Sequence, residues 1–275
     1  MMKVSIVIPC FNTAELLRKN LPRVLEASQN PNNNILEIIV VDDASPDSSP
    51  EVVKKEFPQI RLIRHRVNRG FSAAVNTGVR MAKGELVCLL NSDVVPEKDY
   101  SWARGDFRTG YLSHSMGKES IDAHISLWAS GGSAVFKRDY WMNLGGMDEK
   151  LFPPFYWEDI DLSYRAYKRG LSILWEPNAG VEHKHESTIS QLSRGYTQRM
   201  RERNELLFVW KNITSTHLFR KHIGALFARI FRHPGYIRIV LLALMKIGNV
   251  LRARRKEVKE AKVSDETIFA RFAAK

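Results

Sequence analysis

Three acidic residues, Glu158, Asp159 and Asp161, directly follow the aromatic residues at 155–157. A carboxylate held beside a hydroxyl group can accept its proton, so Asp159 and Glu158 have the chemistry of a general base and a group that orients hydroxyls. The alternative is structural, because acids in the first turn of a helix are stabilised by the helix dipole and Gly170 would end such a helix. We expect Asp161 to face the surface of that helix.

The first ninety residues contain the elements that would position such a site. Apolar, β-branched runs at 4–8, 36–41, 60–64 and 85–90 predict buried strands, and helices are predicted near 13–28, 49–57 and 72–83. Asn12 and Glu15 have the spacing of a cap for the first helix. Strands that alternate with helices predict an α/β fold with a mostly parallel, Rossmann-like sheet flanked by helices.

Polar residues follow three of these strands at Pro9–Asn12, Asp42–Asp43 and Asn91–Asp93. The carboxyl ends of parallel strands meet at one edge of a sheet, where α/β proteins bind their ligands. This pattern predicts one half of a nucleotide site. For Asp42 and Asp43 the alternative is that they cap turns.

Eight segments, in this order, resemble the family 2 glycosyltransferases of the GT-A fold, especially the rhamnosyl- and galactofuranosyl-transferase-like members. They are VSIVIPCFN at 4–12, IIVVDDAS at 38–45, NRGFSAAVNTGV at 68–79, LLNSD at 89–93, SGGSAVFKR at 130–138, GGMDEKLF at 145–152, WEDIDLSYRAYKRG at 157–170 and VEHKHEST at 181–188. The resemblance covers about residues 3–210. It implies transfer of a sugar from a nucleotide-diphospho-sugar to an acceptor hydroxyl with inversion, and Asp159 matches the general base, with Glu158 beside it.

The resemblance also implies how the donor is bound. Asp43 would contact the base or the ribose, and further donor and acceptor contacts fall on Pro9, Phe11, Asn12, Asn68, Gly70, Asn91, Gly131, Gly132 and Trp157. Arg201 and Arg203 are candidates either for pairing with phosphate or for a solvated helix face. The segment from Asp93 to Gly131 is shorter than the family pattern, so it carries no substrate inference.

A divalent cation, Mn²⁺ or Mg²⁺, is the cofactor that the resemblance implies. The Asp-x-Asp motif of the family appears here as Asn91-Ser92-Asp93, which keeps the last carboxylate. His183 lies 24 residues after Asp159, the spacing at which related enzymes carry a metal-binding histidine. We therefore expect Asp93 and His183 to bind the metal, with imidazole favouring Mn²⁺.

The net charge of +12 lies in the C-terminal part of the chain. Residues 211–262 hold 13 Lys or Arg and two Glu, whereas residues 1–210 are nearly neutral. We therefore expect a catalytic domain at 1–210 and a basic amphipathic helical segment at 211–275. Its apolar stripes predict peripheral contact with an anionic membrane, with no apolar run long enough to span it. The alternative is that these helices pack on the catalytic domain or on a second subunit, as in a homodimer.

Composition limits the other function classes. Cys10 and Cys88 lie in apolar runs, which is typical of reduced, intracellular proteins, and no signal peptide is evident, so we expect a cytoplasmic protein on the inner membrane face. A near-neutral first domain argues against a nucleic-acid-binding protein. The alternatives that stay open are a sugar nucleotidyltransferase and an inactive family member that only binds nucleotide sugars. The expected partners are a UDP-, dTDP- or GDP-sugar and a glycan or lipid-linked acceptor.

Overall fold

The computed structural model describes residues 1–95, 102–117, 120–179, 182–183 and 193–272, with the backbone alone at 94–95 and 182–183. The chain forms two compact units. Unit 1 comprises residues 1–98, 130–149 and 180–192, and unit 2 comprises residues 99–129, 150–179 and 193–275. This division does not coincide with the predicted boundary after residue 210, because the C-terminal helices share a core with residues 150–210.

Unit 1 is built around a five-stranded sheet in the order β3-β2-β1-β4-β9, which confirms the predicted α/β fold. The strands are β1 (Val4–Cys10), β2 (Ile35–Asp42), β3 (Arg61–Arg64), β4 (Leu86–Leu90) and β9 (Ser133–Lys137). The first four run parallel, and β9 pairs antiparallel with β4. Since β2 and β4 lie on opposite sides of β1, the strand order reverses at β1, where such sheets open a crevice for ligands.

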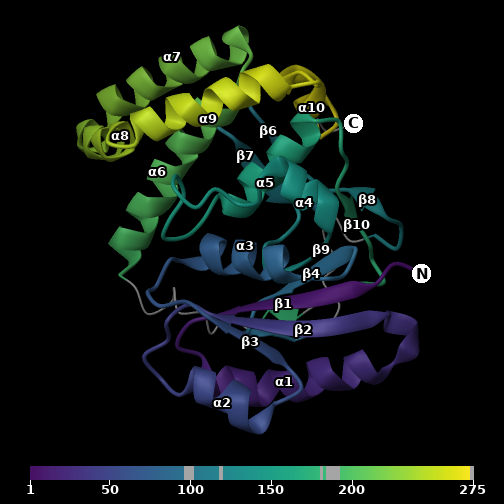
Figure 1. Ribbon diagram of the computed structural model, residues 1–275. Helices are drawn as coiled ribbons and strands as arrows, with labels where there is room; N and C mark the ends of the chain where they lie inside the picture. Colours follow the sequence, from purple (N-terminus) through teal and green to yellow (C-terminus); the bar gives the residue numbers. More distant parts are fainter. Residues whose placement is uncertain (96–101, 118–119, 180–181, 184–192, 273–275) are drawn as a thin grey trace. The chain divides into compact units, whose positions relative to one another are not determined.

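Helices cover both faces of this sheet (Figure 1). Helices α1 (Ala14–Gln29) and α2 (Ser49–Glu56) lie on one face, and α3 (Phe71–Met81) lies on the other. Small residues let α3 approach the strands closely, since a Cβ added at Gly78 would lie 2.3 Å from the Cγ1 atom of Val7. Unit 1 also contains the turn η1 (Pro31–Asn33), α4 (Arg138–Leu144), and the short strands β5 (Val94–Val95) and β11 (Glu182–His183).

The N-terminus of α1 differs from the predicted cap. Asn12 has a φ of 57° and its side chain does not cap the helix. Instead, the backbone N–H groups of Thr13 and Ala14 donate to the side chains of Ser49 (3.0 Å) and Asp47 (3.0 Å). The predicted pair of Asn12 and Glu15 was therefore wrong, because Asp47 in the loop after β2 and Ser49 at the start of α2 supply the capping oxygens from 33 or more residues away.

Unit 2 combines short strands with a helical layer. The strands β6 (Ala103–Asp106) and β7 (Ser113–Met116) form one antiparallel pair, and β8 (His124–Ile125) and β10 (Leu174–Trp175) form another. The helices are α5 (Glu158–Lys168), α6 (Arg194–Asn212), α7 (Thr216–Arg232), η3 (Pro234–Tyr236), α8 (Ile237–Leu244), α9 (Ile247–Glu260) and α10 (Asp265–Ala270).

The C-terminal helices are part of the core of unit 2. Apolar residues of α8, α9 and α10, among them Ala243, Val250 and Ile268, are buried in one cluster with α5 and α6. The ammonium of Lys168 lies 2.7 Å from the carboxylate of Asp265, and both side chains are fully buried. These contacts match the alternative in which the helices pack on the part of the chain before residue 211.

Within the described residues, no single helix is both long and apolar enough to cross a membrane. The segments Pro234–Leu244 and Ile247–Glu260 together meet the requirements of length and composition, but they are bent by 70° at the break between them.

Candidate active site

Asp43 follows the last residue of β2 and organises the loop at 68–70. Its side chain is almost completely buried, and its carboxylate accepts hydrogen bonds from the backbone N–H groups of Arg69 (2.9 Å) and Gly70 (2.7 Å). Gly70 has a φ of 86°, a conformation that favours glycine. The exposed side chain of Asn68 also accepts from the Gly70 N–H (3.2 Å). Asp43, Asn68 and Gly70 are therefore brought together, as the sequence predicted.

His65 is a member of this arrangement that the sequence analysis missed. Its Nδ1 atom lies 2.7 Å from the Asp43 carboxylate, and its Nε2 atom lies 3.0 Å from the hydroxyl of Thr77. Because an ionised carboxylate can only accept, Nδ1 carries the proton and Nε2 accepts from Thr77. His65 directly follows β3, so a search for polar residues at the carboxyl ends of the strands would have found it.

The other residues near the ends of β1 and β2 have structural partners. Asp42 is fully buried and accepts hydrogen bonds from the backbone N–H of Ser45 (3.3 Å), with the Arg64 guanidinium 3.2 Å away. Pro9 lies within β1 opposite Val41, so it does not form the loop as predicted. Phe11 is half-buried beyond the strand end, where its ring remains a candidate for contact with a base.

The end of β4 packs against the loop before β9. The N–H of Asn91 donates to the carbonyl of Gly132 (2.9 Å), and a Cβ at Gly132 would lie 2.5 Å from the Asn91 side chain. Gly131 and Gly132 are both buried. The Oδ1 atoms of Asn91 and Asn20 are buried without a hydrogen-bond partner among the described residues, and both residues line a cavity of about 10 Å³. That volume is about the size of one water molecule.

The predicted metal ligands lie in, or next to, two short strands that pair with each other. Asp93 is half-buried after β4, and β11 pairs with β5 so that His183 is opposite Val94. The side chain of His183 lies outside the described residues. A carboxylate and an imidazole are oxygen and nitrogen donors that suit Mn²⁺, so the residue types fit the implied cation. Among the described side chains, no three of His, Cys, Asp and Glu form a metal-binding group.

The acids of unit 2 lie in the first turn of α5, after two residues with left-handed backbone. Tyr156 and Trp157 have φ values of 69° and 78°, which cost free energy in residues with a Cβ. Asp159 accepts a hydrogen bond from the N–H of Ile160 (2.8 Å). The Oε2 atom of Glu158 is buried and has no hydrogen-bond partner among the described residues. Burial, followed by the charge of Asp159, raises the pKa of Glu158 to about 8.

Two predictions for this turn were wrong. Asp161 is completely buried rather than exposed, and its carboxylate lies 2.8 Å from the guanidinium of Arg165 and 2.8 Å from the ammonium of Lys211. Trp157, expected to contact a sugar, is buried with its ring centroid 5.1 Å from that of Phe208. Asp161 therefore faces the core because α6 supplies its partners, and Trp157 is a core residue.

The two arginines of α6 have different roles. Arg203 is buried and donates to the carbonyl of Pro153 (2.6 Å), so it is neither a phosphate ligand nor part of a solvated face. Arg201 is exposed and its guanidinium lies 4.7 Å from the ring centroid of Tyr156. Because its guanidinium is exposed, Arg201 remains the candidate for binding an anionic ligand. Burial, followed by the charge of Arg201, lowers the pKa of the nearby His114.

The first part of this chain matches the model of a known family. The family model described as Glycosyl transferase family 2 matches residues 5–103. Those residues include β1, β2, the Asp43 loop, and Asn91 and Asp93.

Curated relatives match between about a third and two thirds of the chain. A dolichyl-phosphate beta-glucosyltransferase of Trichomonas vaginalis is 35% identical over 97 residues, which are 33% of this chain and 30% of that protein. The dolichol-phosphate mannosyltransferase of Pyrococcus furiosus is 35% identical over 96 residues, 34% of this chain and 26% of that protein. A poly-beta-1,6-N-acetyl-D-glucosamine synthase of Staphylococcus aureus is 24% identical over 207 residues, 64% of this chain and 48% of that protein. The chain thus spans less than half the length of each.

Two solved structures share the fold. A mannosyltransferase from Pyrobaculum calidifontis, in complex with GDP-Man and Mn²⁺, has a TM-score of 0.53 at 18% identity and covers 94% of this chain and 87% of its own. GalNAc-T7 with UDP, GalNAc and Mn²⁺ has a TM-score of 0.56 at 16% identity and covers 86% of this chain and 57% of its own. At these identities the likeness shows the GT-A-like fold alone.

Proposed function

We propose that this chain, whose residues 5–103 carry the sequence of glycosyltransferase family 2, transfers a sugar from a nucleotide-diphospho-sugar to an acceptor hydroxyl with inversion. The observation that carries the proposal is the buried Asp43 carboxylate, which accepts from two successive backbone N–H groups and from His65 at the carboxyl edge of a parallel sheet. That arrangement holds the loop at 68–70 in place for a nucleotide. The resemblance to rhamnosyl- and galactofuranosyl-transferases belongs to this proposal.

The proposed reaction assigns a separate role to each of these residues. Asp159 accepts the proton of the acceptor hydroxyl as its oxygen attacks the anomeric carbon. Glu158, which keeps its proton at neutral pH, is able to donate a hydrogen bond to a sugar or acceptor oxygen. Asp93 and His183 would hold a divalent cation, which neutralises the charge of the leaving diphosphate when bound.

The donor and acceptor are proposed only as classes. The solved relatives hold UDP or GDP-Man with Mn²⁺, which supports a UDP- or GDP-sugar and a manganese ion; a dTDP-sugar rests on the sequence resemblance alone. Three curated relatives named for dolichyl phosphates or a polysaccharide support a lipid-linked or glycan acceptor. Contact of residues 211–262 with the inner face of the cell membrane is part of the same proposal.

A donor screen followed by a variant tests this function. One of the UDP-, dTDP- and GDP-sugars should raise the unfolding temperature when Mn²⁺ is present, because a ligand that binds only the folded chain stabilises it. Asp159→Asn should keep that protection and lower turnover by roughly 10²–10⁴. The matched control is Asp139→Asn, which removes another first-turn acid, from α4, where no site is assigned.

Each outcome of this screen has a separate meaning. Turnover of Asp159→Asn within a few-fold of the parent would remove Asp159 from the mechanism. Donor binding without transfer to any acceptor would favour the inactive family member. Release of pyrophosphate from a nucleoside triphosphate and a sugar phosphate would favour the nucleotidyltransferase.

A further inference from the structure

Helix α8 is apolar on two faces. Its sequence, IRIVLLAL, contains a single charged residue, Arg238. One face, with Ile239, Val240 and Ala243, is buried in the core of unit 2. The other face and the following residue are exposed, with Leu241 at 55%, Leu244 at 43% and Met245 at 82% exposure. A helix that is apolar all round is expected to be buried or to contact a membrane, so the outer face of α8 requires an explanation.

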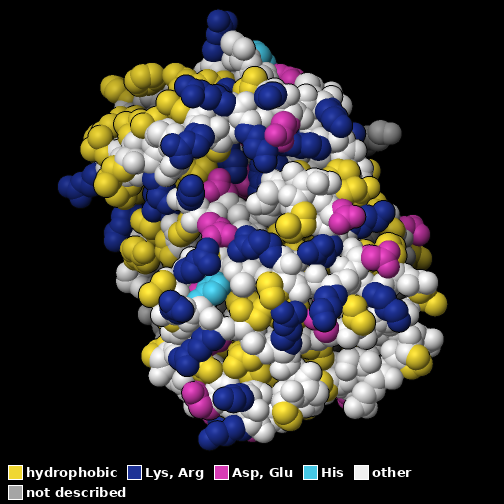
Figure 2. Space-filling model, in the orientation of Figure 1, with side chains coloured by type: hydrophobic (Ala, Val, Ile, Leu, Met, Phe, Trp, Pro, Cys, Tyr) yellow, Lys and Arg dark blue, Asp and Glu magenta, His cyan; other side chains and the backbone are white. Residues whose placement is uncertain are grey.

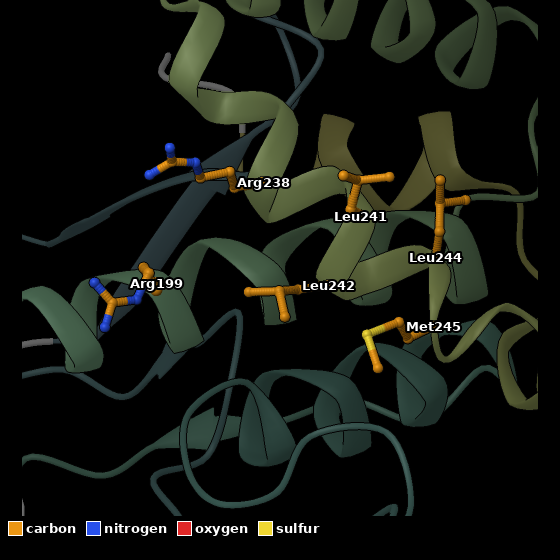
Figure 3. A pocket seen from close by; sticks show the side chains of 6 residues that line it. All are labelled: Arg199, Arg238, Leu241, Leu242, Leu244 and Met245. Carbon is orange, nitrogen blue, oxygen red and sulfur yellow. The ribbon is translucent and has the colours of Figure 1, made fainter.

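A groove of about 730 Å³ lies along this outer face, between α6 and α8. Its lining residues are Arg199, Arg238, Leu241, Leu242, Leu244 and Met245. Figure 3 shows the guanidinium groups of Arg199 and Arg238 at one end of the groove, and the leucines and Met245 toward the other end. The groove therefore has a cationic end and an apolar end.

The nearby acids do not neutralise the cationic end. Glu202 and Glu205 of α6 both pair with Arg229, at 3.2 and 3.7 Å. Within the part of the chain that the structure describes, neither Arg199 nor Arg238 forms an ion pair, and both are exposed. Two guanidinium groups in such a position suit a phosphate, which accepts hydrogen bonds from their planar forks.

Helices α7 and α9 also expose apolar residues. Phe227 and Phe231 of α7 are 68% and 88% exposed, and Leu251 of α9 is 49% exposed. Figure 2 shows hydrophobic side chains gathered, with Lys and Arg beside them, over the region where Figure 1 labels α7 and α8. Clusters of exposed apolar residues rimmed by cations are typical of surfaces that bind the headgroup layer of a membrane.

We propose that this groove binds one anionic phospholipid of a membrane, with its phosphate between Arg199 and Arg238 and its hydrocarbon chain along Leu241, Leu244 and Met245. The inference deepens the proposed membrane contact and rests on it, but it does not depend on the transfer chemistry. A volume of about 730 Å³ lies within the range of roughly 300–1,000 Å³ for sites that hold a small ligand. Charge complementarity and the apolar end together select a lipid rather than free phosphate.

The test uses the full chain and dihexanoyl phosphatidylglycerol below its micelle concentration, so that no bilayer field contributes. This lipid should raise the unfolding temperature of the parent chain, whereas the same concentration of inorganic phosphate should not. Arg199→Ala with Arg238→Ala should weaken the binding by about 10-fold or more, since each guanidinium–phosphate contact contributes on the order of 1 kcal/mol. Arg252→Ala with Arg255→Ala is the matched control, because it removes the same charge from exposed positions of α9.

A second pair of variants tests the apolar end. Leu241→Gln with Met245→Gln changes exposed side chains, so folding should be intact, and it should also lower the lipid affinity. On vesicles that contain phosphatidylglycerol, the groove variants should sediment less than the Arg252 and Arg255 control, and vesicles of phosphatidylcholine should bind weakly in every case.

Several outcomes would overturn the inference. Equal losses of lipid affinity in the Arg199 and Arg238 variant and in the Arg252 and Arg255 variant would show diffuse electrostatic attraction. A rise in unfolding temperature with inorganic phosphate alone would show a simple anion site. Concentration-dependent dimers that Leu241→Gln with Met245→Gln dissolves would show that a second copy covers α8. Nucleotide-sugar protection, measured on the same variants, should be unchanged, so a failure of the groove is separable from a failure of the proposed transferase.

Discussion

Replacing Glu158 by glutamine should stabilise the protein at neutral pH. The Oε2 atom of Glu158 is buried without a partner among the described residues, and burial together with the charge of Asp159 raises its pKa to about 8 from an ordinary 4.5. Between these two pH values the folded state holds a proton that the unfolded state has released. The contribution of Glu158 to the unfolding free energy therefore falls as pH rises from about 4.5 to 8.

The size of this effect on the unfolding free energy follows from the same pKa. Each pKa unit corresponds to about 1.4 kcal/mol, so the penalty accumulated at pH 7 is up to about 3 kcal/mol. Glu158→Gln removes the titrating group and should recover up to that amount at pH 7 and almost nothing near pH 4.5. The interpretation of Glu158 as a capping carboxylate predicts the opposite sign, because loss of a charge that favours the helix dipole costs about 0.3–1 kcal/mol.

Urea unfolding at pH 5, 6, 7 and 8 measures this difference. Tryptophan fluorescence reports mainly on unit 2, which holds five of the six tryptophans. Glu51→Gln is the matched control, since Glu51 is an exposed acid in the first turn of α2. Adding Asp159→Asn to the parent should lower the pKa of Glu158, because the charge of Asp159 is one cause of its elevation. A difference in unfolding free energy between Glu158→Gln and the parent that does not grow from pH 5 to 8 would refute the reasoning.

Three further changes have expected outcomes in unit 2. Asp161→Ala should lower the unfolding free energy by about 3–5 kcal/mol, measured by urea unfolding, because it leaves the buried charges of Arg165 and Lys211 without their partner. Burial lowers the pKa of His222 below its ordinary 6.5, so the unfolded state takes up a proton first as pH drops. The unfolding temperature should therefore fall below about pH 6.5, and His222→Gln should flatten that pH dependence. An unchanged pH dependence in the variant would argue against this role of His222. In a chain that ends at residue 211, unit 2 should no longer unfold cooperatively when circular dichroism is followed on heating, because α8, α9 and α10 complete its core. A soluble product that unfolds cooperatively would contradict this.

The sequence predicted the sheet of unit 1 and the polar residues at its carboxyl edge. Continuous β-branched runs are typical of buried parallel strands, and those at 4–8, 36–41 and 85–90 lie within one residue or two of β1, β2 and β4. Because parallel strands end at a common edge, the positions of Asp43 and Asn91 followed from chain order alone. The local sequence pattern was sufficient here, because the residues of each strand indicate where it begins and ends.

The partners of the buried acids could not be predicted in this way. Asp43 is held by the backbone of residues 69 and 70 and by His65, and Asp161 pairs with Lys211, 50 residues away. An acid in a first helical turn has the same local pattern whether it caps the helix, titrates in a pocket or pairs in the core. Glu158 and Asp161 differ only through what α6 and the core place around them.

The basic segment shows why a count of charges does not measure affinity for a membrane. Residues 211–262 hold 13 Lys or Arg, which favoured an anionic partner. Two of them are paired with carboxylates: Lys211 with Asp161, and Arg229 with Glu202. A charge that is paired with a carboxylate in the folded chain contributes little to attraction at a distance. Lys246 and Arg254 keep their charge, but they donate to the carbonyls of Leu151 and Ile213 within the chain. The salt dependence of vesicle binding should therefore be weaker than the total charge implies, and the exposed apolar face of α8 should supply the part that high salt does not remove.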